Sequence, residues 1–245
     1  MTNNKIGLVL PMYNEEGNVE SLIEALSMVR QNHSLDLLAI CVNDGSADDT
    51  LKLLQEASTK YNFVRLVNHG KNKGLGQAIR SGIGKALELK VDLIGFMDGD
   101  LTHDPNDLPK FVAKVNEGYD FVIGSRFIKG GGMVQVPLFR QLFSIFGNLA
   151  ARFILRVPVR DCTTGYRVIK REVFEKIKLE EPGFGIQLEE VVKAYAAGFK
   201  IGEVPIILGN RVHGKSKMFY GYDLVKNYLI LFRKSLKWLK EIDKK

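Results

Sequence analysis

The first half of the chain alternates short apolar runs with segments that repeat apolar residues at helical spacing. Five apolar runs read as buried strands: KIGLVL, LDLLAICV, FVRLV, VDLIGFM and DFVIGS. The segments between them predict helices at about residues 16–30, 48–58, 77–89 and 104–115. Apolar strands that alternate with helices indicate an α/β fold with a mainly parallel sheet covered by helices on both faces.

Polar clusters follow these strands directly. They are PMYNEEGN, NDGS, the Gly/Lys loop HGKNKGLG, and Asp98-Gly99-Asp100. In open parallel sheets, ligands bind beyond the carboxyl ends of the strands. The pattern therefore predicts one binding site at this edge of the sheet.

The second half has a different pattern, beginning with a long apolar helix predicted over residues 136–157. Its polar residues recur every four positions: Arg140, Ser144, Asn148, Arg152 and Arg156. A four-residue step drifts by only about 40° around a helix, so the first three share a face. Two interpretations remain open, a core helix with a solvated stripe, or a helix that presents Arg and hydroxyl groups to an anion while its apolar sides meet core or lipid. A helix near 187–197, the strand KIGEVPII and a helix over 222–242 complete the chain.

The positive charge is concentrated at the C-terminal end. The net charge is +7, and residues 211–245 hold ten Lys or Arg against three acidic residues, so the rest of the chain is balanced. A basic segment attracts nucleic acid, an anionic membrane surface or a polyphosphate. No RNA-binding or helix-turn-helix motif accompanies it, so we expect no nucleic-acid partner.

The C-terminal helix has an apolar stripe with Lys and Arg beside it. We expect residues 1–220 to form one domain and 221–245 to form a basic amphipathic helix that lies on a membrane surface without spanning it. The alternative is that the stripe packs on the protein's own sheet or on a second subunit. Its members are Val225, Leu229, Phe232, Leu236 and Leu239.

The cellular compartment is also suggested by the sequence. The N-terminus has too short an apolar stretch for a signal peptide, and no apolar run approaches the roughly 20 residues that cross a bilayer. Cys41 and Cys162 do not form a CxxC pair, which favours two reduced thiols. We expect a cytoplasmic protein that associates peripherally with the cytoplasmic face of a membrane.

Asp98 and Asp100 are the sharpest chemical feature. Two carboxylates at the mouth of a parallel sheet suit a hard divalent cation, Mg²⁺ or Mn²⁺, that is shared with substrate phosphates. Gly99 between them would let the backbone approach a ligand closely. A surface turn is the alternative. DGDLT also matches the DxDxT pattern of haloacid-dehalogenase-type phosphatases, but that motif normally follows the first strand, and no later GDxxxD pair is present.

Two other polar segments have competing interpretations. Asp44, after the second strand, could accept hydrogen bonds from a base or ribose, or cap the next helix. The loop with Gly74 and Gly76 lacks the third glycine and the later acidic residue of a dinucleotide-binding motif, so we do not expect NAD.

Basic residues outside the first half are suited to phosphate. Arg126 ends the fifth strand, and Arg211, Lys215 and Lys217 lie in RVHGKSK. Arg makes bidentate contacts with phosphate and Lys makes point-charge contacts. A solvated basic loop is the alternative for RVHGKSK.

Taken together, these motifs resemble those of the dolichol-phosphate mannose synthases and related polyprenyl-phosphate members of glycosyltransferase family two. The resemblance spans almost the whole chain and implies a nucleotide-diphospho-sugar transferase fold built on one Rossmann-like sheet. The matching segments are PMYNEEGN, VNDGSADDT, GKNKGLGQAIRSG, MDGDLTHDP, GSRF, the helix with Arg140 and Ser144, DCTTGYR, FGIQLEE and RVHGKSK.

The resemblance also implies roles for individual residues. It implies a nucleotide site formed by Pro11, Tyr13, Glu15, Val42 and Asp44. It implies that the donor diphosphate and its metal meet Asp98, Gly99 and Asp100, with Asp98 and Asp100 as the metal ligands. It implies that Arg126, Arg211 and Lys217 bind phosphate groups where donor and acceptor meet, and that Arg126, Arg140, Ser144 and Arg211 hold the acceptor phosphate.

The chain departs from the family pattern at three positions. DGD replaces the frequent DAD, Asn43 replaces an Asp, and Thr102 stands where some members supply a further metal contact from Gln. Glu189 is a candidate base if the acceptor is a hydroxyl, and otherwise a helix-surface residue.

The implied activity is metal-dependent, inverting transfer of mannose from GDP-mannose to a polyprenyl phosphate, with Asp98, Asp100, Arg126 and Arg211 in the catalytic roles. One alternative keeps the fold but uses UDP-glucose or another nucleotide sugar, or a soluble sugar acceptor. Another is a non-catalytic nucleotide-binding subunit of a membrane complex, which the intact Asp98 and Asp100 disfavour. A membrane-protein partner or a second copy of the chain stays open.

Overall fold

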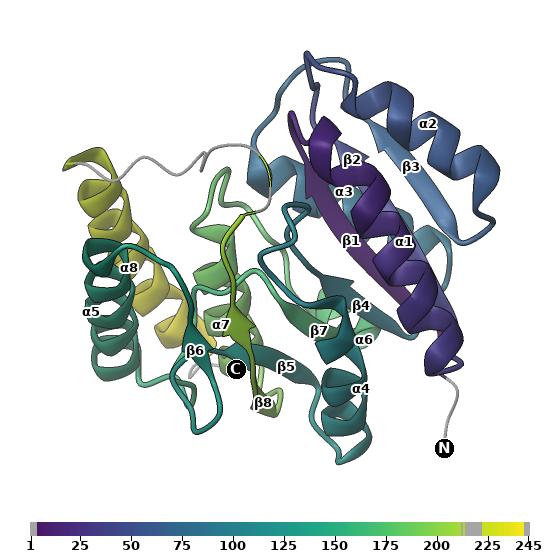
Figure 1. Cartoon of the computed structure of the whole chain (residues 1–245). Coiled ribbons are helices and arrows are strands. Elements are labelled where there is room, and N and C mark those ends of the chain that lie inside the picture. Colours follow the sequence, from purple (N-terminus) through teal and green to yellow (C-terminus); the bar gives the residue numbers. More distant parts are fainter. Residues whose placement is uncertain (1–3, 212, 214–221, 243–245) are drawn as a thin grey trace.

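A seven-stranded sheet forms the centre of the molecule. The computed structural model describes residues 4–211, 213 and 222–242. The strand order is β3-β2-β1-β4-β7-β5-β8, and helices cover both faces of the sheet (Figure 1). The strands are β1 (Ile6–Met12), β2 (Leu37–Asn43), β3 (Val64–Asn68), β4 (Leu93–Phe96), β5 (Phe121–Ser125), β7 (Arg167–Lys170) and β8 (Ile201–Pro205), and a two-stranded sheet pairs β6 (Gly132–Met133) with β9 (Ile207–Leu208).

The pairing confirms a mainly parallel α/β sheet, with one exception. β7 runs antiparallel to both of its neighbours, β4 and β5, whereas the other pairs of the large sheet are parallel. The sequence pattern did not predict β7, because its four residues, RVIK, are too few to show a periodicity. This strand of the second half therefore lies between β4 and β5, two strands of the first half.

The helices lie close to their predicted positions. Those of the first half are α1 (Glu16–Asn32), α2 (Thr50–Lys60), α3 (Leu75–Glu88) and α4 (Leu108–Asn116), the last preceded by a 3-10 turn at Pro105–Asp107. Those of the second half are α5 (Leu138–Leu155), α6 (Arg171–Lys176), α7 (Ile186–Ala196) and α8 (Tyr222–Ile242). The short α6 was not predicted.

The strand register aligns the polar clusters. Met12 at the end of β1 pairs with Asn43 at the end of β2, which in turn pairs with Asn68 at the end of β3. The loops that follow these strands therefore start at the same edge of the sheet, as the sequence predicted. All seven residues of β2 are buried, which explains why this strand is apolar throughout instead of alternating.

The second half contains an exposed apolar surface. α5 and α8 pack against each other and lie at the end of the molecule away from β3 (Figure 1). On α8, Phe232 and Leu239 pack against the core, whereas Leu229 and Leu236 are exposed, so these four members of the predicted stripe are divided. The fifth member is Val225, whose side chain the structure does not describe. Large exposed side chains on α5 are Leu138, Phe139, Leu142, Phe146, Leu149, Phe153 and Ile154.

One helix in the described part of the chain, α5, has the length and apolar composition of a membrane span, and only 17% of it is buried. Helices that do not cross a bilayer can have the same length and apolar composition. The predicted division between residues 220 and 221 falls within residues that the structure does not describe.

Candidate active site

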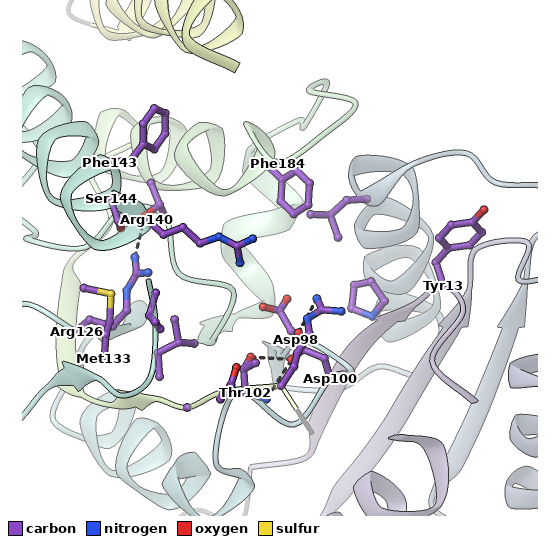
Figure 2. A pocket seen from close by; sticks show the side chains of 18 of the residues that line it. Tyr13, Asp98, Asp100, Thr102, Arg126, Met133, Arg140, Phe143, Ser144 and Phe184 are labelled. Atoms are coloured by element: carbon purple, nitrogen blue, oxygen red, sulfur yellow. Dashed lines mark hydrogen bonds and ion pairs between the residues drawn. The ribbon is translucent and has the colours of Figure 1, made fainter. Parts of the chain in front are cut away.

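A cavity of about 1110 Å³ opens at the carboxyl ends of β1, β2 and β4 and continues toward α5 and α8. It brings together most of the residues that the sequence pointed to, although they come from distant segments (Figure 2). The predicted residues that line it are Pro11, Tyr13, Glu15, Asp44, Asp98, Asp100, Arg126, Arg140, Ser144 and Arg211.

Asp100 lies at the base of the cavity in a network of polar contacts. One carboxylate oxygen, Oδ1, accepts hydrogen bonds from the Thr102 hydroxyl at 2.6 Å and from its backbone N–H at 3.1 Å. The other, Oδ2, pairs with Arg211 Nη2 at 2.7 Å, and Arg211 Nη1 lies 3.4 Å from Glu15 Oε1. Thr102 therefore orients the Asp100 carboxylate, and Arg211 neutralises the charges of both Asp100 and Glu15.

Asp98 presents its carboxylate to the open side of the cavity. Its side chain keeps 42% of its accessible surface, and one oxygen lies 3.8 Å from Nδ1 of the buried His103. Desolvation raises the pKa of Asp98; the charge of His103 opposes this shift, and the Asp100 carboxylate adds to it. A Cβ added at Gly165 would lie 2.6 Å from Asp98 Oδ1, so the absence of a side chain there leaves room for the carboxylate.

These two carboxylates fit a divalent cation that takes its remaining ligands from elsewhere. Within the described residues, no group of three or more His, Cys, Asp or Glu side chains could hold a metal. Mg²⁺ commonly binds in this way, through one or two carboxylates together with substrate phosphates and water.

Asp44 anchors the Gly/Lys loop at the other side of the cavity. Its oxygens accept hydrogen bonds from the backbone N–H of Lys73 at 2.9 Å and of Gly74 at 2.8 Å, and Oδ1 lies 2.7 Å from His69 Nδ1. Asp44 is not the cap of α2: that helix begins at Thr50, whose N–H donates to Asp48. The interpretation of Asp44 as a helix cap was therefore wrong, and its carboxylate holds the loop that borders the cavity.

Two predicted donor residues lie outside the cavity lining. Val42 is completely buried in β2, so its side chain belongs to the core. A Cβ at Gly99 would come within 3.3 Å of the Pro11 carbonyl oxygen, so the glycine permits close approach to β1. Lys217, like Lys215, lies outside the described residues.

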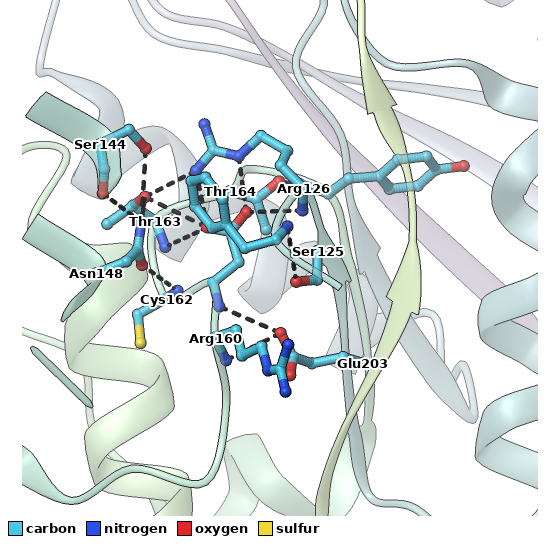
Figure 3. Close-up of polar contacts among 12 residues, drawn as sticks. Ser125, Arg126, Ser144, Asn148, Arg160, Cys162, Thr163, Thr164 and Glu203 are labelled. Atoms are coloured by element: carbon cyan, nitrogen blue, oxygen red, sulfur yellow. Dashed lines mark hydrogen bonds and ion pairs between the residues drawn. The ribbon is translucent and has the colours of Figure 1, made fainter. Parts of the chain in front are cut away.

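The part of the cavity that was predicted to hold the acceptor phosphate is built around Arg126. Its Nε and Nη2 atoms bind the two oxygens of buried Asp161, each at 2.7 Å, and Nη2 also donates to the Thr163 hydroxyl at 2.9 Å (Figure 3). Arg140 and Ser144 project from α5 into the same cavity (Figure 2). The predicted shared helix face therefore points to the cavity and not to solvent.

Glu189 has a structural role. Its side chain is fully buried, accepts hydrogen bonds from the backbone N–H groups of Glu180 and Glu181, and pairs with Lys193 at 2.8 Å. It does not line the cavity. Both sequence interpretations, a catalytic base and a helix-surface residue, were wrong, since this carboxylate holds the loop before α7.

The sequence analysis missed several residues of the cavity. Thr163 lies between Arg126 and α5, and its only signal was its place in the DCTTGYR segment. The far end of the cavity is apolar, and no periodicity along the sequence could show that these side chains meet. That end is lined by Val136, Pro137, Phe143, Phe146, Phe184, Leu229 and Phe232.

Comparison with known proteins agrees with this architecture. Residues 8–178 match the family model described as Glycosyl transferase family 2. The chain is 32% identical over 98% of its length to a dolichol-phosphate mannosyltransferase from Pyrococcus furiosus, of which it spans 66%. It is 34% identical over 86% of its length to a polyprenol monophosphomannose synthase from Mycolicibacterium smegmatis, of which it spans 80%.

Solved structures support the fold. Glucosyl-3-phosphoglycerate synthase from Mycobacterium tuberculosis, in a crystal structure with Mn²⁺ and UDP-glucose, superimposes with a TM-score of 0.68 at 20% identity. The superposition covers 98% of this chain and 79% of that chain. At this identity, the likeness shows a shared fold.

Proposed function

The chain belongs to glycosyl transferase family 2 and is a glycosyltransferase, and we propose that it transfers mannose from GDP-mannose to a polyprenyl phosphate. The observation that carries this proposal is the shape of the cavity. One continuous cavity lies between the sheet edge and the helices α5 and α8. It is lined by the carboxylates of Asp98 and Asp100 at the bottom, by arginines, and by apolar side chains at its far end. A lipid that carries a phosphate needs this combination of charged and apolar surfaces.

The names of the relatives point to the same acceptor class. The proteins from P. furiosus and M. smegmatis are named for dolichol phosphate and polyprenol monophosphomannose, and a third relative, from Micrococcus luteus, is an undecaprenyl-phosphate mannosyltransferase. The M. luteus protein is 34% identical to this chain, and the alignment covers 87% of each of the two proteins.

On the donor side, we assign Asp98 and Asp100 to a Mg²⁺ or Mn²⁺ ion and the sugar diphosphate, and Tyr13, Glu15 and Asp44 to the nucleotide side of the cavity. The bound metal would stabilise the charge that develops on the departing nucleoside diphosphate. Thr102 keeps the Asp100 carboxylate oriented for this role. Arg211 would exchange its carboxylate partners for phosphate as the substrates bind.

On the acceptor side, the chemistry requires positive charge and no general base. A phosphomonoester has a second pKa near 6 and is largely dianionic at neutral pH, so it is already a competent nucleophile. Arg126, Arg140 and Arg211 line one cavity and can hold two anionic substrates close together. Attack by the phosphate on the sugar carbon would expel the nucleoside diphosphate with inversion. The structural role of Glu189 agrees with a reaction that needs no carboxylate base.

We also propose that the protein binds the cytoplasmic face of a membrane through α5 and α8 together. Phe153 and Leu138 on α5 keep 75% and 70% of their accessible surface. Asn148, on the opposite side of α5, is buried and bonded to the loop before β7, which suits a helix that lies along the lipid surface. The sequence predicts membrane binding by α8; among the side chains that the structure describes, α5 contributes more of the exposed apolar surface than α8.

The decisive experiment is a panel of nucleotide sugars, including GDP-mannose and UDP-glucose, tested with and without Mn²⁺ against farnesyl phosphate. Release of nucleoside diphosphate and formation of the glycolipid are measured. We expect farnesyl phosphate and a divalent ion to be required, and GDP-mannose to be preferred. Transfer to 3-phosphoglycerate but not to farnesyl phosphate would replace the lipid acceptor with a soluble one. Equal activity in excess chelator would overturn the metal role.

A further inference from the structure

Asn148 lies where three separate segments meet. It is buried in α5, next to the loop of residues 160–165 and the Arg126 side chain (Figure 3). Its Oδ1 accepts the backbone N–H of Cys162 at 2.6 Å, and its Nδ2 donates to the Ser144 carbonyl oxygen at 2.9 Å. A backbone donor and a backbone acceptor together determine which end of the amide is nitrogen. The Asn148 Nδ2 group must therefore face the Thr163 hydroxyl, which lies 3.0 Å away.

This geometry constrains the Thr163 hydroxyl. A hydroxyl oxygen has two acceptor lone pairs and one hydrogen to donate. Arg126 Nη2 donates to Thr163 Oγ1 at 2.9 Å and Asn148 Nδ2 donates at 3.0 Å, so both lone pairs are used. Neither neighbour can accept a hydrogen bond through these nitrogens. The hydroxyl hydrogen must point elsewhere.

Within the part of the chain that the structure describes, the Thr163 hydroxyl donates to Asp161 Oδ1, and this acceptor is a weak one. It lies at 3.4 Å, well beyond the usual 2.7–2.8 Å of an O–H···O bond. The same oxygen already accepts Arg126 Nη2 at 2.7 Å. Thr163 is partly exposed and lines the cavity together with Arg126, Arg140 and Ser144. An anionic oxygen in the cavity would be a better acceptor.

We propose that Thr163 donates a hydrogen bond from its hydroxyl to the acceptor phosphate, and that Asn148 is the positioning residue that directs it there. The inference rests on the proposed function, because it assumes that a phosphate occupies this side of the cavity. Ser144 and Thr163 then offer hydroxyl groups from α5 and from the 160–165 loop, while Arg126 and Arg140 supply charge. The loop is held in place from β8 as well, since Glu203 accepts the N–H groups of Arg160 and Asp161.

The first test compares Thr163→Val with Thr163→Ser in the full-length protein. Valine keeps the shape of threonine and removes the hydroxyl, whereas serine keeps the hydroxyl. A lost hydrogen bond to a charged group corresponds to about a tenfold to hundredfold loss. We expect Thr163→Val to raise the KM for farnesyl phosphate by that factor and to leave the KM for the nucleotide sugar within about twofold. Thr163→Ser should restore most of the loss, and Thr59→Val, on the exposed surface of α2, is the matched control.

Calorimetric binding of farnesyl phosphate separates this inference from the proposed function. If the unaltered protein binds farnesyl phosphate without transferring a sugar to it, the proposed activity is wrong, while a weaker affinity in Thr163→Val still supports the hydroxyl contact. Equal affinity in Thr163→Val and the unaltered protein overturns the contact whether or not transfer occurs. If the unaltered protein does not bind farnesyl phosphate, both proposals fail.

The role of Asn148 is tested by Asn148→Asp. The substitution keeps an oxygen for the Cys162 N–H but turns the other end of the side chain into an acceptor, which would capture the Thr163 hydrogen. We expect a larger rise in the farnesyl phosphate KM than in Thr163→Val, with an unchanged KM for the nucleotide sugar showing that the fold is intact. An acceptor KM equal to that of the unaltered protein would contradict the positioning role. Loss of both substrates together would assign Asn148 to fold stability only, and would also contradict it.

Discussion

The donor half and the acceptor half of the cavity are built by different means. On the donor side, Pro11 lies near the end of β1, and Asp44 and Asp98 come from the loops that follow its parallel neighbours β2 and β4. On the acceptor side, Arg126, Arg140 and Thr163 come from the end of β5, from α5 and from a loop before an antiparallel strand. Backbone pairing aligns the first group, whereas side-chain hydrogen bonds hold the second group together.

The two halves also treat apolar surface differently. The strands β1 and β2 bury nearly all their side chains between layers of helices. α5 instead exposes a row of Leu and Phe side chains, whereas Asn148, Ala151 and Leu155 on its other side are buried against the protein. The proposed donor side is therefore a platform of sheet and loops, and the proposed acceptor side offers exposed apolar surface that would suit a partly apolar ligand.

The largest effect, a loss of turnover, is expected from Asp100→Asn on the donor side of the cavity. Loss of a charge-stabilising contact in an active site typically costs a hundredfold or more in turnover, and we expect at least about that loss here and in Asp98→Asn. Initial rates at saturating concentrations of both substrates are the measurement. Asp36→Asn, at an exposed position before β2, is the matched control and should keep full activity. A folded Asp100→Asn protein with near-normal turnover would refute the metal role.

The acceptor side is probed by Arg140→Ala. Because a charge-assisted hydrogen bond is lost, we expect the KM for farnesyl phosphate to rise by about tenfold to hundredfold while that for the nucleotide sugar changes little. Arg152→Ala removes an exposed arginine from the same helix outside the cavity and serves as the control. A rise in KM confined to the nucleotide sugar would show that Arg140 contributes to the donor site and not to the acceptor site.

The difference in exposed apolar surface predicts a difference in membrane binding. Replacing Leu138 and Phe153 together with Ser should reduce co-sedimentation with anionic vesicles by about tenfold or more, since each side chain contributes on the order of 1.5–3 kcal/mol when fully buried. Met28→Ser removes an exposed apolar side chain from α1, which keeps 58% of its accessible surface, and should have no effect. If the unaltered protein stays in the supernatant at low salt, the membrane proposal is wrong.

The smallest effect, a change in stability with pH, is expected from an ion pair beneath the cavity. Arg167 of β7 pairs with Glu190 of α7 at 2.6 Å, and both side chains are buried. Burial raises the pKa of Glu190 from 4.5 to about 7, against the opposing charge of Arg167. Between these values the unfolded chain has lost the proton and the folded protein keeps it, so this contribution to the free energy of unfolding falls as the pH rises.

Glu190→Gln should remove that slope. Thermal unfolding at pH 5 and pH 8 gives the Tm of the variant minus that of the unaltered protein. We expect this difference to be higher at pH 8 than at pH 5. Glu24→Gln, at an exposed position on α1, should show no such change. A constant difference between the two pH values would contradict the raised pKa.

Local pattern was sufficient for much of the fold. The alternation of apolar strands with helices predicted the parallel sheet, because central strands such as β1, β2 and β4 are buried on both faces and an amphipathic helix is buried on one. The periodicity of the apolar residues reports this burial. It also predicted that Asp44 and Asp98 would share an edge, since the carboxyl ends of parallel strands meet there. The motifs extended this to Arg126, Arg140 and Ser144, which do line one cavity.

The tertiary structure alone decided the partners of these residues. Asp44 holds the Gly/Lys loop, Glu189 holds the loop before α7, and Gly99 allows close approach to β1. Each role depends on an atom of another segment, which the local pattern does not show. The antiparallel β7 and the contact between Asn148 and Thr163 had no sequence signal for the same reason. Periodicity reports which side of an element is buried, whereas hydrogen-bond partners are selected by distances of a few tenths of an ångström that only the packed chain determines.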